Sequence, residues 1–440
     1  MKTKKTALSL MIACTSLSYV HPSVAAVDET FEFHGYFRSG TLSSSTDDWE
    51  RSTWAGVTKE MVGRLGVEAD NDFSISLSKK WVLDNGKSVK VTVGEEDNTD
   101  SYSASDFPDA YLEYEGVLDS GILWAGKRSY AKDENYIFMT DFFYIDYSGT
   151  GAGVIDYQVG DAKVDFAYIA SDRTEDEDYN LTRDLDTNNI LHTVHLGVDW
   201  GTWKLDGSLK YMHDNQSYTS GTDGYWDDYN SVWVEAVDAY YTKYTDRGAD
   251  LSLTYSRDDF FWIPGNGFSK IIAQGGIGLG SQQLLGGTLT TYNAYRPGSV
   301  TKGGVSGAAT MANNYTNDTS ARLLFWGGYF FDNGINVFPS IQAQYNDHAE
   351  DNIYDYWFSA MVRPTFPVSE NFYIQSEIGY AYKNWNGGTW FEKKITVAPT
   401  VVMGVGQGIA PEIRFVASYL PEANDGDGDT IVGIQADVSW

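Results

Sequence analysis

Hydrophobic and polar residues alternate with a period of two in many short stretches of this chain. Near the C-terminal end the apolar residues share one parity, namely Val432, Ile434, Ala436, Val438 and Trp440. The residues between them are small or polar, namely Gly433, Gln435, Asp437 and Ser439. Such a period predicts a β-strand with one apolar face and one wet face. Because the pattern recurs, we predict an all-β protein; the other stretches are residues 31–38, 163–168, 204–211, 250–255, 335–345 and 372–383.

This alternation fits two architectures. A soluble β-sandwich buries its apolar faces, whereas a transmembrane β-barrel turns them toward lipid. The polar face carries full charges, as at Lys204, Asp206 and Lys210, and these suit the outside of a sandwich or the lumen of a barrel. Aromatic residues at the strand ends on the apolar face favour the barrel, because such rings form girdles at the membrane interface.

The connections between the predicted strands come in two sizes. The short ones contain Asn or Gly, as tight turns require, and lie at residues 84–86, 160–161, 201–202 and 332–334. The long ones are polar and lie at residues 39–60, 172–189, 214–229, 284–317 and 422–429. Short connections at one end and long ones at the other predict a transmembrane antiparallel β-barrel.

The N-terminal segment resembles an export signal. Lys2, Lys4 and Lys5 precede an uncharged apolar stretch at residues 6–17, and small residues at 23–26 suit a cleavage site. We therefore predict a signal peptide at residues 1–26 and one barrel domain at residues 27–440. This domain has room for roughly 16 to 18 strands at about 10 residues per strand plus connections, which is wide enough for an aqueous channel.

Composition excludes several classes of function. The formal net charge of -30 argues against a nucleic-acid partner, because phosphates would be repelled. The single cysteine, Cys14, lies in the leader, so the mature chain is expected to hold no disulfide. No GxSxG, phosphate-binding glycine loop or HExxH occurs. The acidic residues at 425–429 resemble the start of a calcium loop, but no glycine follows at the position that such a loop needs and no glutamate closes it. We therefore expect no enzyme activity, no cofactor and no metal.

Five segments carry a resemblance to a known family, namely Phe33–Gly40, Arg64–Gly66, Ile122–Arg128, Asp141–Gly153 and Pro411–Arg414. Together they resemble the maltoporins, the sugar-specific outer-membrane porins. The resemblance implies an 18-stranded barrel that forms a homotrimer among the lipids of a Gram-negative outer membrane. It also implies a carbohydrate solute and a third loop, residues 126–149, that folds inward and narrows the pore.

The resemblance also implies which residues line the pore and bind the sugar: Tyr36, Arg38, Arg64, Tyr102, Lys132, Glu134, Asp141, Phe143 and Asp146. Aromatic rings stack on the C–H face of a pyranose, and charged groups exchange hydrogen bonds with its hydroxyls. Each of these contacts must be weak, because a channel has to release its solute.

Some positions depart from the family pattern. Asp72, Gly408 and Ser439 stand where aromatic residues are usual, and Phe143 lacks the hydroxyl of the usual constriction tyrosine. These departures indicate a pore for sugars other than long maltodextrins.

The candidate residues also have structural interpretations. Tyr36 fits an interface girdle, and the basic candidates fit pore-wall carboxylates that they neutralise. Asp141 and Asp146 fit anchors that hold the loop without touching a solute. At the level of function, the alternatives to a sugar-selective channel are a non-selective general diffusion porin, a secreted carbohydrate-binding sandwich, and an outer-membrane barrel hydrolase. The hydrolase would have to use one of three candidate histidines, His192, His195 or His213. The first two are three residues apart, so on a strand they point to opposite faces.

Overall fold

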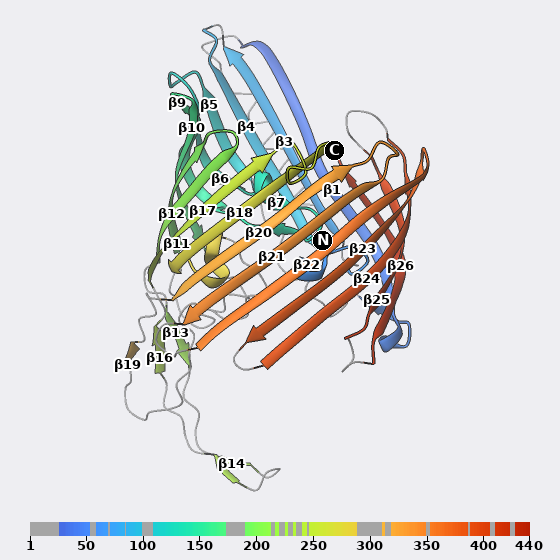
Figure 1. The fold of residues 1–440 in the computed structure, drawn as a ribbon. Coiled ribbons are helices and arrows are strands. Elements are labelled where there is room, and N and C mark those ends of the chain that lie inside the picture. The colour runs from blue at the N-terminus through green and yellow to red at the C-terminus, as the bar shows by residue number, and fades with distance from the viewer. Residues whose placement is uncertain are drawn as a thin grey trace, which may run out of the picture.

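The computed structural model (Figure 1) describes most of the 440-residue chain. The described residues are 26–52, 59–68, 71–83, 85–98, 109–172, 190–212, 216–219, 225–227, 232–234, 240–243, 246–287, 310–312, 318–348, 353–385, 388–404, 410–422 and 427–440. The predicted leader therefore lies outside the described residues except for Ala26, where the first strand begins.

Eighteen antiparallel strands in the described part of the chain form a closed barrel (Figure 1). Their bounds are β1 (Ala26–Ser44), β3 (Asp72–Leu83), β4 (Ser88–Asn98), β5 (Ala110–Glu115), β6 (Ile122–Arg128), β9 (Gly149–Val159), β10 (Ala162–Asp172), β11 (Ile190–Asp199), β12 (Trp203–Met212), β17 (Arg247–Arg257), β18 (Asn266–Gly278), β20 (Thr319–Phe330), β21 (Asn336–His348), β22 (Ile353–Ser369), β23 (Phe372–Trp385), β24 (Gly388–Val402), β25 (Glu412–Leu420) and β26 (Asp429–Ser439). Each of these strands pairs with the next one in this order. The predicted transmembrane barrel is confirmed.

Strands β1 and β26 close the barrel. Their register runs from Tyr36 opposite Ser439 to Ser44 opposite Ile431. Gly35 and Trp440 extend this ladder, with N–H to carbonyl distances of 3.0 and 2.9 Å. A Cβ atom on Gly35 would come within 2.4 Å of the Trp440 ring, so the closure needs a glycine here.

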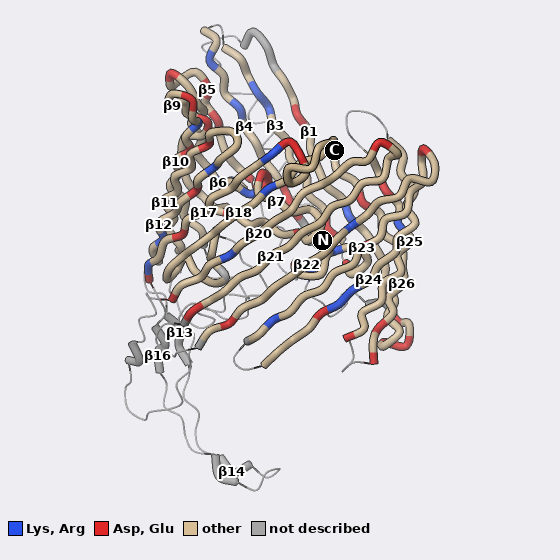
Figure 2. Tube along the Cα trace, in the orientation of Figure 1, with Lys and Arg blue, Asp and Glu red and all other residues tan. Residues whose placement is uncertain are grey.

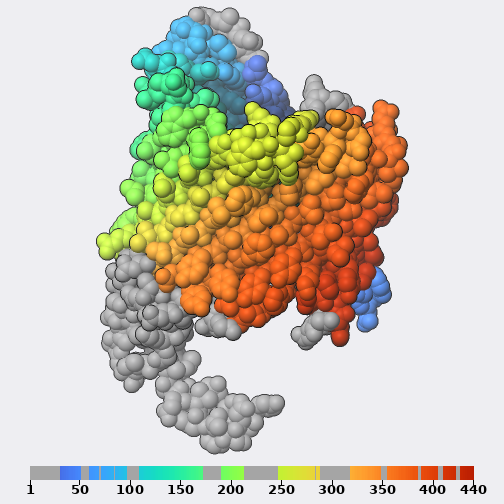
Figure 3. Space-filling model, in the orientation of Figure 1, coloured from blue at the N-terminus to red at the C-terminus, as the bar shows by residue number. Residues whose placement is uncertain are grey.

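The two faces of each strand match the predicted alternation. On β12, Leu209 is 65% exposed on the outside, whereas the neighbouring Lys210 is 3% exposed on the inside. On β26, Ile434 faces outward and Gln435 is buried inside. Figure 3 shows a continuous surface on the viewed face, and Figure 2 shows acidic residues at several strand ends and turns. An apolar outside around a polar inside suits a barrel in lipid.

Short turns join the strands where they were predicted. Gly160 and Gly201 both have positive φ, 61° and 84°, and a Cβ atom on either would meet nothing within 4 Å. Conformation rather than space therefore favours glycine at these two turns. The predicted long connection at residues 39–60 is wrong at its start, because β1 runs on to Ser44 and its residues pair with β26 there. Most of the other predicted long connections, including residues 173–189 and 288–309, lie outside the described residues.

Smaller elements accompany the barrel strands. They are η2 (Ser45–Asp47), β2 (Arg51–Ser52), α2 (Lys59–Val62), η3 (Asp133–Asn135), β7 (Tyr136–Ile137), β8 (Phe142–Phe143), β13 (Gln216–Thr219), β14 (Tyr225–Asp227), β15 (Val232–Val234), β16 (Tyr240–Lys243), η4 (Gln282–Gly287) and β19 (Thr310–Ala312). Strands β7 and β8 form a small hairpin in the connection between β6 and β9. Among the described residues, no helix has the length and apolar character needed to cross a membrane.

Candidate functional site

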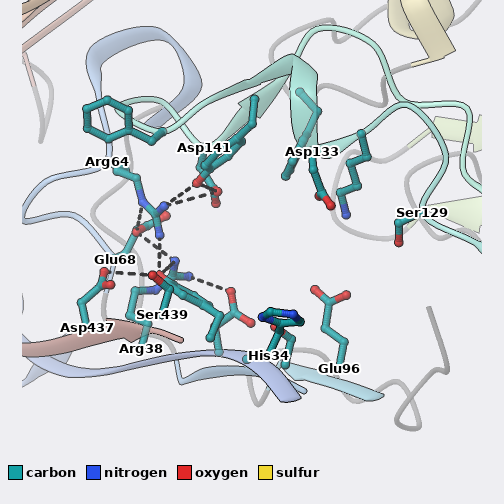
Figure 4. Close-up of a pocket in the computed structure, with 18 of the residues that line it drawn as sticks. His34, Arg38, Arg64, Glu68, Glu96, Ser129, Asp133, Asp141, Asp437 and Ser439 are labelled. Carbon is teal, nitrogen blue, oxygen red and sulfur yellow. Dashed lines mark hydrogen bonds and ion pairs between the residues drawn. The ribbon is translucent and has the colours of Figure 1, made fainter. Parts of the chain in front are cut away.

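A cavity of about 860 Å³ lies between the barrel wall and the connections that carry α2 and the β7–β8 hairpin (Figure 4). Six of the predicted site residues line it, namely Tyr36, Arg38, Arg64, Lys132, Asp141 and Phe143. Asp72 and Ser439, where the family pattern has aromatic residues, line it too. The third such position, Gly408, lies outside the described residues. Positively and negatively charged side chains, together with several aromatic rings, therefore line the cavity.

Arg64 connects the two sides of this cavity (Figure 4). It lies in the short turn after α2, next to Gly63, which has a φ of 94°. Its Nε donates to Glu68 over 2.7 Å, its Nη1 to the Tyr136 hydroxyl over 2.7 Å, and its Nη2 to the Tyr36 hydroxyl over 3.0 Å. A planar guanidinium suits this task because it offers several donors in a fixed geometry.

Tyr36 and Arg38 point into the barrel from β1, as their parity predicted. The Tyr36 hydroxyl donates to Asp437 over 3.3 Å across the closing strand pair and accepts from Arg38 Nη1 over 3.2 Å. Arg38 is only 1% exposed and forms ion pairs with Glu68 at 3.2 Å and Asp72 at 3.5 Å. Arg38 therefore neutralises the carboxylates of Glu68 and Asp72 and donates a hydrogen bond that positions Tyr36.

Asp141 is held by three donors. Lys59 Nζ and the Tyr136 hydroxyl lie 2.7 and 2.8 Å from its carboxylate oxygens, and Arg64 Nη1 lies at 3.4 Å. Burial alone would raise the pKa of Asp141, but Arg64 and Lys59 outweigh burial and hold it well below its ordinary value. Asp141 also has a φ of 55°, a conformation that non-glycine residues seldom adopt. It is thus an ionised, fixed acceptor at the cavity wall.

Tyr136 is a cavity residue that the sequence reasoning missed. Its ring stacks on Phe143, with ring centroids 4.6 Å apart and planes inclined by 26°. Lys132 Nζ lies 4.6 Å from the centroid of the Phe143 ring. The hydroxyl missing from Phe143 is thus present on the adjacent ring. Lys59, Glu68 and Asp437 were also missed, and no periodic pattern marks the first two.

The remaining predicted site residues lie elsewhere. Glu134 does not line the cavity; its carboxylate pairs with Lys204, and its carbonyl accepts from Lys270 over 2.9 Å. Asp146 does not line the cavity either, and its carboxylate accepts from the Ser148 amide over 2.9 Å within the same connection. Tyr102 lies outside the described residues.

The connection between β6 and β9 is tied to several barrel strands. The Tyr147 hydroxyl donates to Asp250 on β17 over 2.6 Å, and the Tyr130 hydroxyl lies 3.1 Å from His195 Nδ1 on β11. Gln274 on β18 donates to the Tyr144 carbonyl over 2.7 Å. His195 is buried inside the barrel. These bonds fix both ends of the segment that carries Tyr136 and Phe143.

The sequence is similar to known proteins over nearly its whole length. A family model described as LamB porin matches residues 31–440. A maltoporin of Vibrio cholerae is 27% identical over 98% of this chain and 99% of its own length. A maltoporin of Hahella chejuensis is 27% identical over 93% of this chain and 92% of its own length. Among solved structures, an anion-selective porin from Comamonas acidovorans covers 94% of this chain with a TM-score of 0.47 and 10% identity.

Proposed function

Since the chain belongs to the LamB porin family, we propose that it is an outer-membrane channel through which carbohydrates diffuse passively and selectively. The family identifies a channel rather than an enzyme. The observation that carries the sugar preference is the cavity in which Arg64 holds the hydroxyls of Tyr36 and Tyr136. Fixed aromatic rings beside fixed charges are what sugar recognition needs, because a pyranose has apolar C–H faces and a polar rim.

The contacts suit transport because each is weak. A solute bound at millimolar affinity is held by only about 4 kcal/mol and leaves readily. The inner charges are largely paired with one another, as Arg38 is with Glu68 and Lys59 with Asp141. Paired charges keep the wall wet and ordered without trapping an ion, so a neutral oligosaccharide or glycoside is the expected solute.

Several finer features belong to the same proposal. Residues 126–149 fold inward and narrow the pore, which their hydrogen bonds to β11, β17 and β18 support. The sugar contacts come from the six predicted site residues that line the cavity, whereas Glu134 and Asp146 act only through the loop. The channel is a homotrimer in the outer membrane of a Gram-negative bacterium, and a signal peptide directs its export.

Single-channel current in planar bilayers tests this function. The wild-type current is titrated with a panel of neutral oligosaccharides, and a sugar-selective pore shows reversible, concentration-dependent block by at least one of them. Tyr36→Ala should weaken that block. Tyr211→Ala is the matched control, because Tyr211 faces outward on β12 and should leave block unchanged. A current that no sugar reduces would instead identify a general diffusion porin.

A further inference from the structure

We infer that Tyr136, rather than Phe143, provides the selective aromatic contact at the narrow part of this channel. The inference rests on the proposed function and names a residue that determines which sugars are recognised. It starts from the β7–β8 hairpin, where Tyr136 and Phe143 are directly opposite in register. Side chains directly opposite on paired strands stand close together, so the hairpin itself brings the two rings into their stack.

The Phe143 ring is already occupied by protein neighbours. Tyr136 stacks on it at 4.6 Å, and the Lys132 ammonium lies 4.6 Å from its centroid. The stack covers one face of each ring, and the additional cation leaves Phe143 with less free surface for a pyranose than Tyr136 has. Phe143 therefore acts mainly as the support against which Tyr136 rests.

The Tyr136 hydroxyl is fixed from two sides. It accepts from Arg64 Nη1 over 2.7 Å and donates to Asp141 Oδ1 over 2.8 Å. Burial raises the pKa of Tyr136 well above its ordinary value, so the hydroxyl keeps its proton and remains a donor to Asp141. The ring is thus held by one stacking contact and two hydrogen bonds.

The same guanidinium also holds Tyr36, through Nη2 at 3.0 Å. One arginine therefore sets the positions of two tyrosine rings, one on the barrel wall and one on the β7–β8 hairpin, and both line the cavity. A sugar unit that enters meets rings whose orientation needs no further ordering. Preorganised contacts favour binding because less conformational entropy is lost when the solute arrives.

The test compares Tyr136→Leu, Tyr136→Phe and Phe143→Leu in bilayer titrations with the sugars that block the wild-type channel. We expect Tyr136→Leu to raise the apparent dissociation constant about threefold to tenfold, the range that one aromatic contact supplies. Tyr136→Phe should raise it less, because the ring stays while its two hydrogen bonds are lost. Phe143→Leu should have a smaller effect than Tyr136→Leu. Tyr211→Phe is the control, since Tyr211 faces outward on β12 and does not line the cavity.

Two measurements distinguish a loss of sugar recognition from a disturbed channel structure. Open-channel conductance without sugar and heat-modifiable gel migration should stay near wild type in every variant, and Tyr136→Phe decides the question if Tyr136→Leu does not assemble. The inference is overturned if sugar block is unchanged in both Tyr136 variants, or if Phe143→Leu weakens block at least as much as Tyr136→Leu does. Either result leaves the proposed sugar-channel function standing. A wild-type channel that no sugar blocks overturns the proposed function and the inference together.

Discussion

Arg64 Nη2 donates a hydrogen bond to the Tyr36 hydroxyl across 3.0 Å and so ties the turn after α2 to the first barrel strand. The other guanidinium nitrogens bind Tyr136, Glu68 and Asp141. One side chain therefore fixes the distance between the barrel wall and the β7–β8 hairpin. The width of the cavity at this point depends on a planar group with several donors.

Replacing Arg64 by lysine should loosen this arrangement, because an ammonium at one point cannot reach all of these partners at once. We expect sugar block to weaken about threefold to tenfold, the range that one lost aromatic contact would give. Current titration measures the effect. Arg247→Lys, at an exposed position on β17, is the matched control. Equal block in Arg64→Lys and wild type would show that the guanidinium does not position the rings.

Phe143→Tyr adds a hydroxyl beside the Tyr136 ring. One additional hydrogen bond to a passing sugar contributes about 1 kcal/mol, which corresponds to roughly fivefold in residence time. Current-noise analysis of sugar block should therefore show slower sugar release. Phe166→Tyr adds the same group on the outer face of β10, where Phe166 is half exposed, and should change nothing. Identical release rates in Phe143→Tyr and wild type would show that a hydroxyl added beside the Tyr136 ring does not reach the solute.

Glu60 should make stability depend on pH. Burial, helped by the charges of Asp141 and Glu68 and opposed by Lys59, raises the pKa of Glu60 to about 7. The folded protein then binds this proton more tightly than the unfolded chain, whose pKa is near 4.5. The stabilisation that protonated Glu60 contributes to the folded state is therefore fully present below about pH 4.5 and is lost as the pH rises through about 7.

Glu60→Gln should remove this dependence, which amounts to on the order of 1–3 kcal/mol. Urea unfolding in detergent at pH 5 and pH 8 measures it. The wild type should lose more stability between the two pH values than Glu60→Gln does. Glu370→Gln, in the exposed turn between β22 and β23, is the control and should resemble the wild type. A Glu60→Gln variant with the full wild-type pH dependence would assign the effect to other groups.

The glutamates that pair with the neighbouring Lys394 and Lys393 should contribute very different amounts to the free energy of unfolding. Glu377 is buried and pairs with Lys394 at 2.6 Å and Arg363 at 2.5 Å, whereas Glu422 pairs with Lys393 at the surface. Glu377→Gln leaves two buried cations without their counter-charge and should cost about 3–5 kcal/mol. Glu422→Gln should cost about 0–1 kcal/mol. Urea midpoints that move equally in both variants would refute this contrast.

The barrel was predictable because its strands need only a period of two and turn residues between them. Leu209 and Lys210 illustrate this, since their opposite exposures follow from parity alone. Tyr36 and Arg38 were placed on the inner face by the same argument. Wherever the chain is a long strand, local sequence therefore decides which side chain faces the lumen.

Tyr136 and Glu134 show where local sequence stops being sufficient. Strands β7 and β8 have two residues each, too few for any periodic signal. Tyr136 is placed by Arg64, 72 positions earlier, and Glu134 is turned toward Lys204, 70 positions later. A charged partner on a distant strand, rather than its own neighbours, decides where such a side chain points.

The pairing of β1 with β26 both closes the barrel and completes the candidate site. Tyr36 and Arg38 stand on one side of the seam and Asp437 on the other, so the site is whole only after these two strands have paired. A barrel that stalls before this step has neither a sealed wall nor a finished set of solute contacts. A sheet in which β1 and β26 have not paired therefore has neither a closed pore nor a complete site, so an unselective open channel is not an intermediate of assembly.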